Sequence, residues 1–187
     1  MRRCIVYIMA ELAVIVAVAR ESLGIGYKGQ IPWSLPSDLK RFREITTAPT
    51  IDGGINAVIM GRKTWESLPV RHRPLSNRLN IILTSDSSKT LEATSNLVAT
   101  AGCLDEALLR ASECDRIFVI GGASVYREAL HHPRCTHVYT TMIDGEYTCD
   151  TYFPDILESL GFVQSDSSTQ LIERHVSYQY VEYSRIG

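Results

Sequence analysis

The stretch AVIVAVARESLGIGYKGQIPW, residues 13–33, joins an apolar run to a glycine-rich segment. The run Ala13–Ala19 has the composition of a strand buried on both faces. The segment Gly24–Gly29 has the pattern G-x-G-x-x-G, which binds dinucleotide phosphates when a helix follows directly. Pro32 and Pro36 stand where that helix would continue, and proline inside a helix costs about 3 kcal/mol or more. We therefore interpret the glycines as joints of a flexible loop.

Short apolar runs and amphipathic segments alternate along the rest of the chain. The apolar runs predict strands at residues 13–19, 56–60, 78–84, 116–120, 136–143, 161–166 and 175–185. The amphipathic segments predict helices at residues 37–45, 62–68, 104–111 and 123–130, with Ser37 as the N-cap of the first. This alternation predicts an α/β fold with a mostly parallel sheet, whose last two strands are antiparallel at an edge.

The composition is that of an ordinary globular domain. A chain of 187 residues can bury a sizeable core, and its net charge of −2 gives no support for nucleic-acid binding. Its five cysteines contain no C-x-x-C pair, and its five histidines show no metal-ligand spacing. We therefore expect no metal site and a reducing compartment, which favours the cytoplasm.

Residues 1–12 are interpreted as an N-terminal extension of a single domain at residues 13–187. The extension begins with two arginines and an apolar stretch, as targeting signals do. Glu11 interrupts the apolar stretch, and the part before it is too short to span a bilayer. We therefore expect no membrane association, with mitochondrial targeting as a minor alternative.

Asp38 is the first candidate for a functional acid. It lies in the first turn of its predicted helix, where an acid also stabilises the positive helix end. Asp38 and Phe42 are four residues apart and share a helix face, so the acid borders an apolar surface. A carboxylate in that place suits a ligand with two parallel N–H donors.

Cations and glycines mark two further candidate sites. Arg62, Lys63 and Thr64 open a helix directly after Gly61, and Gly121-Gly122 precede another helix. Cations at a helix start oppose the macrodipole, a conflict that a bound polyanion would remove, although a solvated basic patch is the alternative. Arg78 begins a strand, and Arg71, His72 and Arg73 nearby make a carboxylate-binding patch conceivable.

Six segments of the chain resemble the dihydrofolate reductase family. They are IVAVARESLGIGYKGQIPW, DLKRFREIT, VIMGRKTWESLP, RPLSNRLNIILT, IFVIGGASVY and CDTYFP, and they occur in the family order and spacing. The resemblance implies an eight-stranded, mostly parallel sheet flanked by four helices, with an antiparallel C-terminal edge strand. It also implies NADPH-dependent reduction of 7,8-dihydrofolate to 5,6,7,8-tetrahydrofolate.

The resemblance assigns roles to individual residues. Asp38 matches the acid that binds the pterin 2-amino group and N3 and favours protonation at N5, which hydride transfer to C6 needs. Thr141 matches the threonine that orients this acid, Trp33 matches the loop tryptophan at the pocket edge, and Arg78 matches the arginine that grips the glutamate α-carboxylate. The other residues implied around the substrate are Ile15, Val16, Ala17, Leu39, Phe42, Leu68, Leu75, Ile120 and Tyr126.

The implied NADPH site combines a mobile loop, two glycine turns and a strand end. Its residues are Ala17, Gly24, Ile25, Gly26, Gly29, Gln30, Gly61, Arg62, Lys63, Thr64, Leu83, Thr84, Ser85, Gly121, Gly122, Ala123, Ser124, Val125 and Tyr126. The strand end LTSDSS departs from the family because it lacks the basic residue that many members carry there, and Asp86 would repel a phosphate. This departure makes Arg62 the main expected cation for the 2′-phosphate, with Lys63 beside it.

Two alternatives stay open beside the folate reductase. One is a reductase of the same fold that acts on another heterocycle, such as the pyrimidine reductase of riboflavin synthesis. The other is a non-catalytic folate-binding relative. Dihydrofolate and antifolates such as methotrexate are the expected ligands, and fusion or association with thymidylate synthase is a further expectation left open.

Overall fold

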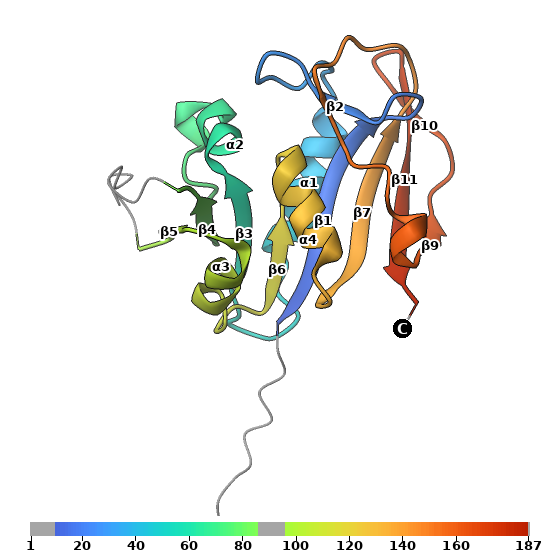
Figure 1. The fold of residues 1–187 in the computed structure, drawn as a ribbon. Coiled ribbons are helices and arrows are strands. Elements are labelled where there is room, and N and C mark those ends of the chain that lie inside the picture. Colours follow the sequence, from blue (N-terminus) through green and yellow to red (C-terminus); the bar gives the residue numbers. More distant parts are fainter. Residues whose placement is uncertain (1–9, 86–95, 187) are drawn as a thin grey trace, which may run out of the picture.

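The predicted α/β architecture is confirmed by the computed structural model, which describes residues 10–85 and 96–186 (Figure 1). The strands are β1 Glu11–Ala19, β2 Gly24–Gly26, β3 Asn56–Gly61, β4 Arg78–Leu83, β5 Val98–Ala101, β6 Arg116–Val119, β7 Cys135–Ile143, β8 Thr151–Tyr152, β9 Phe162–Ser167, β10 Leu171–Glu173 and β11 Val176–Arg185. The α-helices of the described residues are α1 Pro36–Thr47, α2 Arg62–Ser67, α3 Leu104–Arg110 and α4 Ala123–His131, and two short 3₁₀ helices lie at Val70–His72 and Glu158–Leu160.

The main sheet is eight strands wide, as expected. Its order is β10-β11-β7-β1-β6-β3-β4-β5, and β9 and β10 both pair with the outer edge of β11. The strands from β7 to β5 are parallel, whereas β11 runs antiparallel to β7. The antiparallel C-terminal edge is therefore confirmed.

Strand β1 lies at the centre of the sheet and is buried on both faces. Leu12, Val14 and Val16 belong to the core that α3 and α4 cover, whereas Ala13 and Ile15 belong to the core that α1 and α2 cover. In Figure 1, α4 lies in front of β1 and α1 lies behind it. An apolar side chain is needed on each face, which explains why the run has no polar alternation.

The glycine-rich segment forms no helix, which confirms its interpretation as a loop. Its first part is strand β2, which pairs with β8, and a bridge between Tyr27 and Gln30 closes the turn that follows. Trp33, near the end of the loop, packs edge-on against the ring of Tyr147, with 5.1 Å between the ring centroids.

Most predicted element boundaries differ from the observed ones by one or two residues, and two of these differences have a clear local cause. Strand β1 begins at Glu11, two residues before the predicted start, because Glu11 pairs with Arg116 of β6. Helix α1 begins at Pro36, so Ser37 lies inside its first turn and is not the N-cap. The backbone N–H of Ser37 donates instead to the carboxylate of Glu173, at 3.0 Å.

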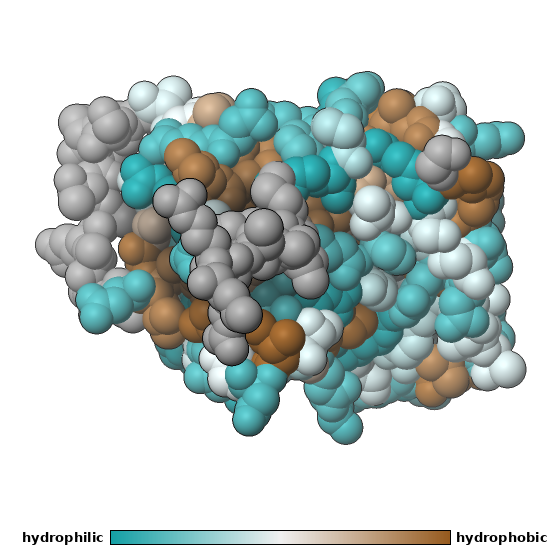
Figure 2. Space-filling view, turned by 90° about the horizontal axis from the view of Figure 1, so that it is seen from below, coloured by the Kyte–Doolittle hydropathy of each residue, from teal (hydrophilic) through white to brown (hydrophobic). Residues whose placement is uncertain are grey.

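The end of the molecule at which the parallel strands begin carries a mixed surface (Figure 2). Over the coloured part of that view, hydrophobic residues lie singly or in small groups among hydrophilic ones. Within residues 10–85 and 96–186, no helix combines the length and the apolar character needed to cross a bilayer.

The buried side chain of Asn56 attaches the end of α1 to the sheet. Its amide nitrogen donates to the carbonyl oxygens of Thr46 and Ala48, each at 3.1 Å. Its amide oxygen accepts the backbone N–H of Arg116, also at 3.1 Å. Asn56 and Thr46 are fully buried, so the Thr46 carbonyl has little access to water as a substitute, whereas Ala48 is exposed and Arg116 is half-buried.

We predict that Asn56→Ala lowers the free energy of unfolding by about 1–3 kcal/mol, because the buried Thr46 carbonyl and two more accessible backbone groups lose their hydrogen-bond partner. Urea denaturation of the purified variant measures the change. Asn96→Ala is the matched control, since Asn96 lies exposed in a turn and its loss should change stability by less than about 0.5 kcal/mol. Equal stability of the two variants would contradict this assignment.

Candidate active site

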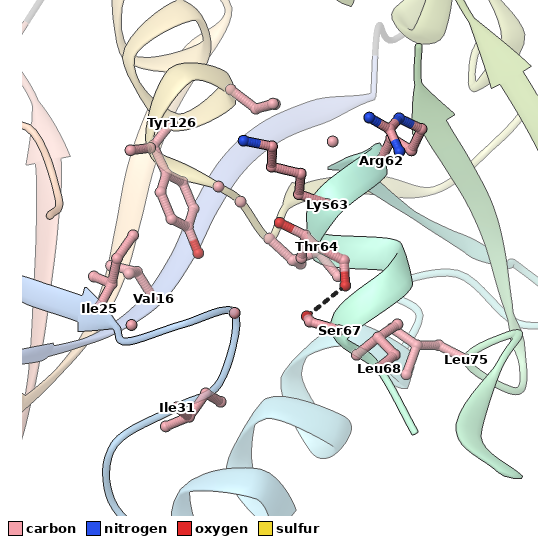
Figure 3. Close-up of a pocket in the computed structure, with 18 of the residues that line it drawn as sticks. Val16, Ile25, Ile31, Arg62, Lys63, Thr64, Ser67, Leu68, Leu75 and Tyr126 are labelled. Atoms are coloured by element: carbon pink, nitrogen blue, oxygen red, sulfur yellow. Dashed lines mark hydrogen bonds between the residues drawn. The ribbon is translucent and has the colours of Figure 1, made fainter. Parts of the chain in front are cut away.

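One large cavity opens at the carboxyl ends of the parallel strands. Its volume is about 1510 Å³, above the range of roughly 300–1,000 Å³ that is usual for a single small-molecule ligand. Residues of the glycine-rich loop, α1, α2 and the start of α4 surround it. Figure 3 shows Lys63, Thr64 and Ser67 of α2 on one side of the cavity and Val16, Ile25 and Tyr126 on the other. The cavity is large enough for two ligands side by side.

The structure brings nearly all the predicted site residues to this cavity. Two predicted residues do not line it, Thr141 and Gly24. Thr141 lies behind Asp38, which does line it. Gly24 packs against Cys149, and a Cβ atom at Gly24 would lie 2.3 Å from the Cys149 sulfur. The predicted residues that line the cavity are Ile15, Val16, Ala17, Ile25, Gly26, Gly29, Gln30, Trp33, Asp38, Leu39, Phe42, Gly61, Arg62, Lys63, Thr64, Leu68, Leu75, Arg78, Leu83, Thr84, Ser85, Ile120, Gly121, Gly122, Ala123, Ser124, Val125 and Tyr126.

Asp38 is a half-buried carboxyl group in the first turn of α1. The Thr141 hydroxyl on β7 donates a hydrogen bond of 2.5 Å to its Oδ1 atom. Burial raises the pKa of Asp38, whereas the Thr141 hydrogen bond and the positive charge of Arg41 act in the opposite direction. The group can therefore accept two N–H donors as a carboxylate and can also hold a proton.

Arg78 is a buried cation at the start of β4. Its Nη1 donates to the Thr46 hydroxyl at 2.6 Å, its Nε donates to the Ser76 carbonyl at 3.0 Å, and its guanidinium lies 5.6 Å from the centre of the Phe42 ring. Burial and the nearby charge of Arg43 lower the pKa of Arg78 to about 10, so it stays charged at neutral pH. Among the described residues no carboxylate pairs with Arg78, which leaves this cation suited to an anionic ligand.

The two glycine turns meet beside the middle of the cavity. The backbone N–H of Gly61 donates to the carbonyl of Gly121 at 2.7 Å, and the Gly121-Gly122 peptide is cis. Gly121 has φ of +114°, and a Cβ atom there would lie 3.1 Å from the ring of Tyr126. The Tyr126 hydroxyl donates to the carbonyl of Ile15 at 3.1 Å, so the ring itself is fixed. A side chain at position 121 would be strained and would press against this ring, so the position requires glycine.

Helix α2 brings cations to the cavity wall. Arg62 forms an ion pair with Glu66 one turn further along, at 2.6 Å, and both side chains are about half exposed. This pair offsets part of the unfavourable placement of Arg62 at a helix start. Lys63 extends from the same helix toward the opposite wall in Figure 3. Asp86, which was expected to repel a phosphate, lies outside the described residues.

Several cavity residues were missed by sequence reasoning. Arg71 and His72 do line the cavity, as the suspected carboxylate patch requires, but Arg73 does not. Gly102 and Cys103 reach the site because β5 pairs with β4, and Asp150 and Thr151 reach it because β8 pairs with β2. The remaining missed residues are Ile31, Arg43, Ser67, Pro69, Pro74, Ser76 and Glu128. Within the described residues no group of three or more His, Cys, Asp or Glu side chains could hold a metal ion.

A large cavity at the carboxyl ends of a parallel sheet, with a half-buried acid and a buried arginine in its wall, is typical of an α/β enzyme. Comparison with known proteins specifies the class further. The sequence model of the dihydrofolate reductase family matches residues 11–185, and the chain belongs to this family.

Individual relatives agree with this assignment. The chain is 38% identical over 186 residues to a dihydrofolate reductase of Aedes albopictus, a match that covers 95% of the chain and 99% of the relative. It is 41% identical over 177 residues to a bifunctional dihydrofolate reductase-thymidylate synthase of Daucus carota, a match that covers 92% of the chain. The chain spans about a third of the length of this plant relative and of the similar one from Glycine max.

Proposed function

We propose that this chain reduces 7,8-dihydrofolate to 5,6,7,8-tetrahydrofolate with NADPH. The observation that carries the proposal is the placement of two charges along α1. Asp38 lies in its first turn, and Thr46, which binds Arg78, lies eight residues later in its last turn. Eight residues of α-helix span about 12 Å, and Phe42 lies between the two ends. An elongated ligand with N–H donors at one end, an aromatic middle and a carboxylate at the other fits this spacing, and dihydrofolate is such a ligand.

In the proposed complex, Asp38 accepts hydrogen bonds from the pterin 2-amino group and N3. The Thr141 hydroxyl holds the carboxylate in place from behind. Negative charge beside the ring favours protonation at N5, which makes C6 a better hydride acceptor. Phe42 and Ile15 belong to the apolar wall that packs against the rings. Arg78 binds the glutamate carboxylate, which replaces the water that a buried cation would otherwise need.

The rest of the cavity fits NADPH. Its volume exceeds the usual range for one small-molecule ligand, and the turn at residues 121–124 lines it. Arg62 and Lys63 would hold the 2′-phosphate, and residues 121–124 would face the pyrophosphate. NADPH, when bound, supplies the hydride. The glycine-rich loop, which contributes Ile25, Ile31 and Trp33 to the wall, would exclude water from the reacting rings.

The direct test is the loss of NADPH absorbance on addition of dihydrofolate, with and without a diaminopyrimidine inhibitor. Turnover that the inhibitor abolishes supports the proposal. A purified, folded protein that binds folate but oxidises no NADPH would instead be a binding relative, and turnover of a pyrimidine substrate alone would favour the other reductase.

Asp38→Asn should lower turnover at pH 7 by about 10²-fold or more, because the variant keeps the shape but loses the charge that favours N5 protonation. Part of the activity should return at low pH, where dihydrofolate reaches the site already protonated. The measurement is kcat between pH 5 and pH 8. Asp52→Asn, at an exposed turn, is the control and should behave as the wild type. Wild-type activity of Asp38→Asn at pH 7 would remove this residue from the mechanism.

Arg78→Leu should weaken dihydrofolate and methotrexate by about 2–5 kcal/mol, since both carry a glutamate carboxylate that loses its charged partner. Small diaminopyrimidines have no such tail and should bind almost unchanged. Dissociation constants from fluorescence titration measure both effects in the same preparation. If both classes of ligand weaken equally, Arg78 acts through folding rather than through the carboxylate.

Arg62→Ala should weaken NADPH by about 1.5–3 kcal/mol, the range for hydrogen bonds to charged groups, and should leave NADH almost unchanged. The variant also leaves Glu66 without its partner, so Glu66→Gln is needed as a companion and should not weaken NADPH. Lys40→Ala removes a comparable exposed pair with Glu44 and is the second control. Dissociation constants at one fixed salt concentration test this, and parallel losses for both cofactors would place the 2′-phosphate elsewhere.

A further inference from the structure

A second charged group lies one turn after Asp38 on α1. Arg41 forms an ion pair with Glu182 of β11, with 3.0 Å between Nη2 and Oε1. Its guanidinium also lies 4.3 Å from the centre of the Tyr180 ring. The Arg41 side chain is only 16% exposed, and Arg41 is not among the residues that line the cavity. It therefore contacts the sheet behind the site rather than the site itself.

The register between β7 and β11 joins this group to the catalytic acid. Tyr180 pairs with Thr141, the residue whose hydroxyl binds Asp38, and Glu182 pairs with Tyr139 two residues earlier on β7. Paired residues of neighbouring strands share a face of the sheet. Asp38 lies over Thr141, and Arg41 lies over Tyr180, so helix and sheet hold the two charges in adjacent positions.

We propose that Arg41 is a positioning residue for the reaction and that it sets the protonation state of Asp38 from outside the cavity. In this proposal, Glu182 controls how strongly Arg41 acts on Asp38. The effect on catalysis rests on the function proposed above, whereas the effect on Asp38 itself does not. The arrangement gives the acid a fixed positive neighbour that a bound ligand does not displace.

The other groups that face Asp38 come from three elements besides α1. They are Thr141 of β7, Tyr180 of β11 and Tyr126 of α4. Burial raises the pKa of both tyrosines, with the charge of Asp38 and, for Tyr180, a hydrogen bond with Tyr178 as further causes, so they stay neutral over the working range. Of these described groups, Arg41 alone is positively charged.

Removal of the Arg41 charge and removal of the Glu182 charge should shift the pKa of Asp38 in opposite directions. A positive charge near a carboxylate favours its ionised form, so removal of the Arg41 charge raises the pKa of Asp38. Glu182 offsets part of that positive charge, so removal of the Glu182 charge lowers the pKa of Asp38. A purely structural role of the ion pair would give both variants the same direction of change, because either one breaks the same contact.

The experiment compares Arg41→Met, Arg41→Lys and Glu182→Gln in the full chain. Titration of the Asp38 carboxyl carbon by NMR in the ligand-free protein gives its midpoint directly. The pH profile of kcat/KM with dihydrofolate and NADPH reports the same group in the enzyme before dihydrofolate binds. We expect the midpoint to move up in Arg41→Met, down in Glu182→Gln and to stay near the wild-type value in Arg41→Lys.

Arg116→Met is the matched control. Arg116 pairs with Glu11 and has the same side-chain exposures as the Arg41 pair, 16% and 34%, and its guanidinium also lies over aromatic rings. Its loss should leave the Asp38 midpoint unchanged. Midpoints that move together in Arg41→Met and Glu182→Gln, or that do not move in either, overturn the inference. Opposite NMR shifts in a protein without dihydrofolate turnover support the inference and overturn only the proposed function.

Discussion

The site depends on where α1 ends, and the buried amide of Asn56 determines that point. Its hydrogen bonds to Thr46 and Ala48 hold the last turn of α1 against the start of β3. A helix is stiff along its axis, so a fixed end also fixes the first turn, about 12 Å away, where Asp38 lies. The acid and the partner of Arg78 are therefore held at a constant separation by a residue that contacts no ligand.

Asp38 and Arg78, the two charges at the ends of α1, are held by neutral hydroxyl groups rather than by opposite charges. Thr141 donates to Asp38, and Thr46 accepts from Arg78. A direct ion pair would stabilise each buried charge better, but it would also occupy the atoms that a ligand must reach. A hydroxyl orients the charged group while its charge stays available. Each charge is therefore less stabilised than it would be in an ion pair, which agrees with the raised pKa of Asp38 and the lowered pKa of Arg78.

Local sequence patterns were sufficient for seven of the nine described strands of the main sheet and for most of the cavity lining. The apolar run of β1 and the prolines after the glycine-rich loop depend on rules that act over a few residues. The strands that were missed, β2, β5, β8 and β10, have two to four residues each, and none has the three consecutive bulky apolar residues that mark the equally short β6. β2, β5 and β8 form because a neighbouring strand that is distant in the sequence offers unpaired backbone groups, whereas β10 forms a hairpin with β11, which follows it directly.

Local sequence patterns also do not show long-range strand pairing, and this explains which cavity residues were not predicted. Cys103 and Thr151 face the cavity only through the pairing of β5 with β4 and of β8 with β2. Gly24 was assigned to the cofactor site by the family resemblance, yet the β2–β8 pairing places it against Cys149. In each case long-range strand pairing, rather than local propensity, decides the direction that a residue faces.

The direction of the Arg41 side chain also depends on long-range strand pairing. Arg41 comes three residues after Asp38, a spacing at which opposite charges on a helix commonly form an ion pair. Instead, the register of β11 presents Tyr180 and Glu182 on the face beneath α1, and these side chains draw the guanidinium toward the sheet. A shift of β11 by one residue would turn both side chains to the opposite face. Arg41 would then be free to pair with Asp38 and neutralise the acid, so the ionisation of the candidate catalytic group depends on the register of a strand that does not touch the cavity.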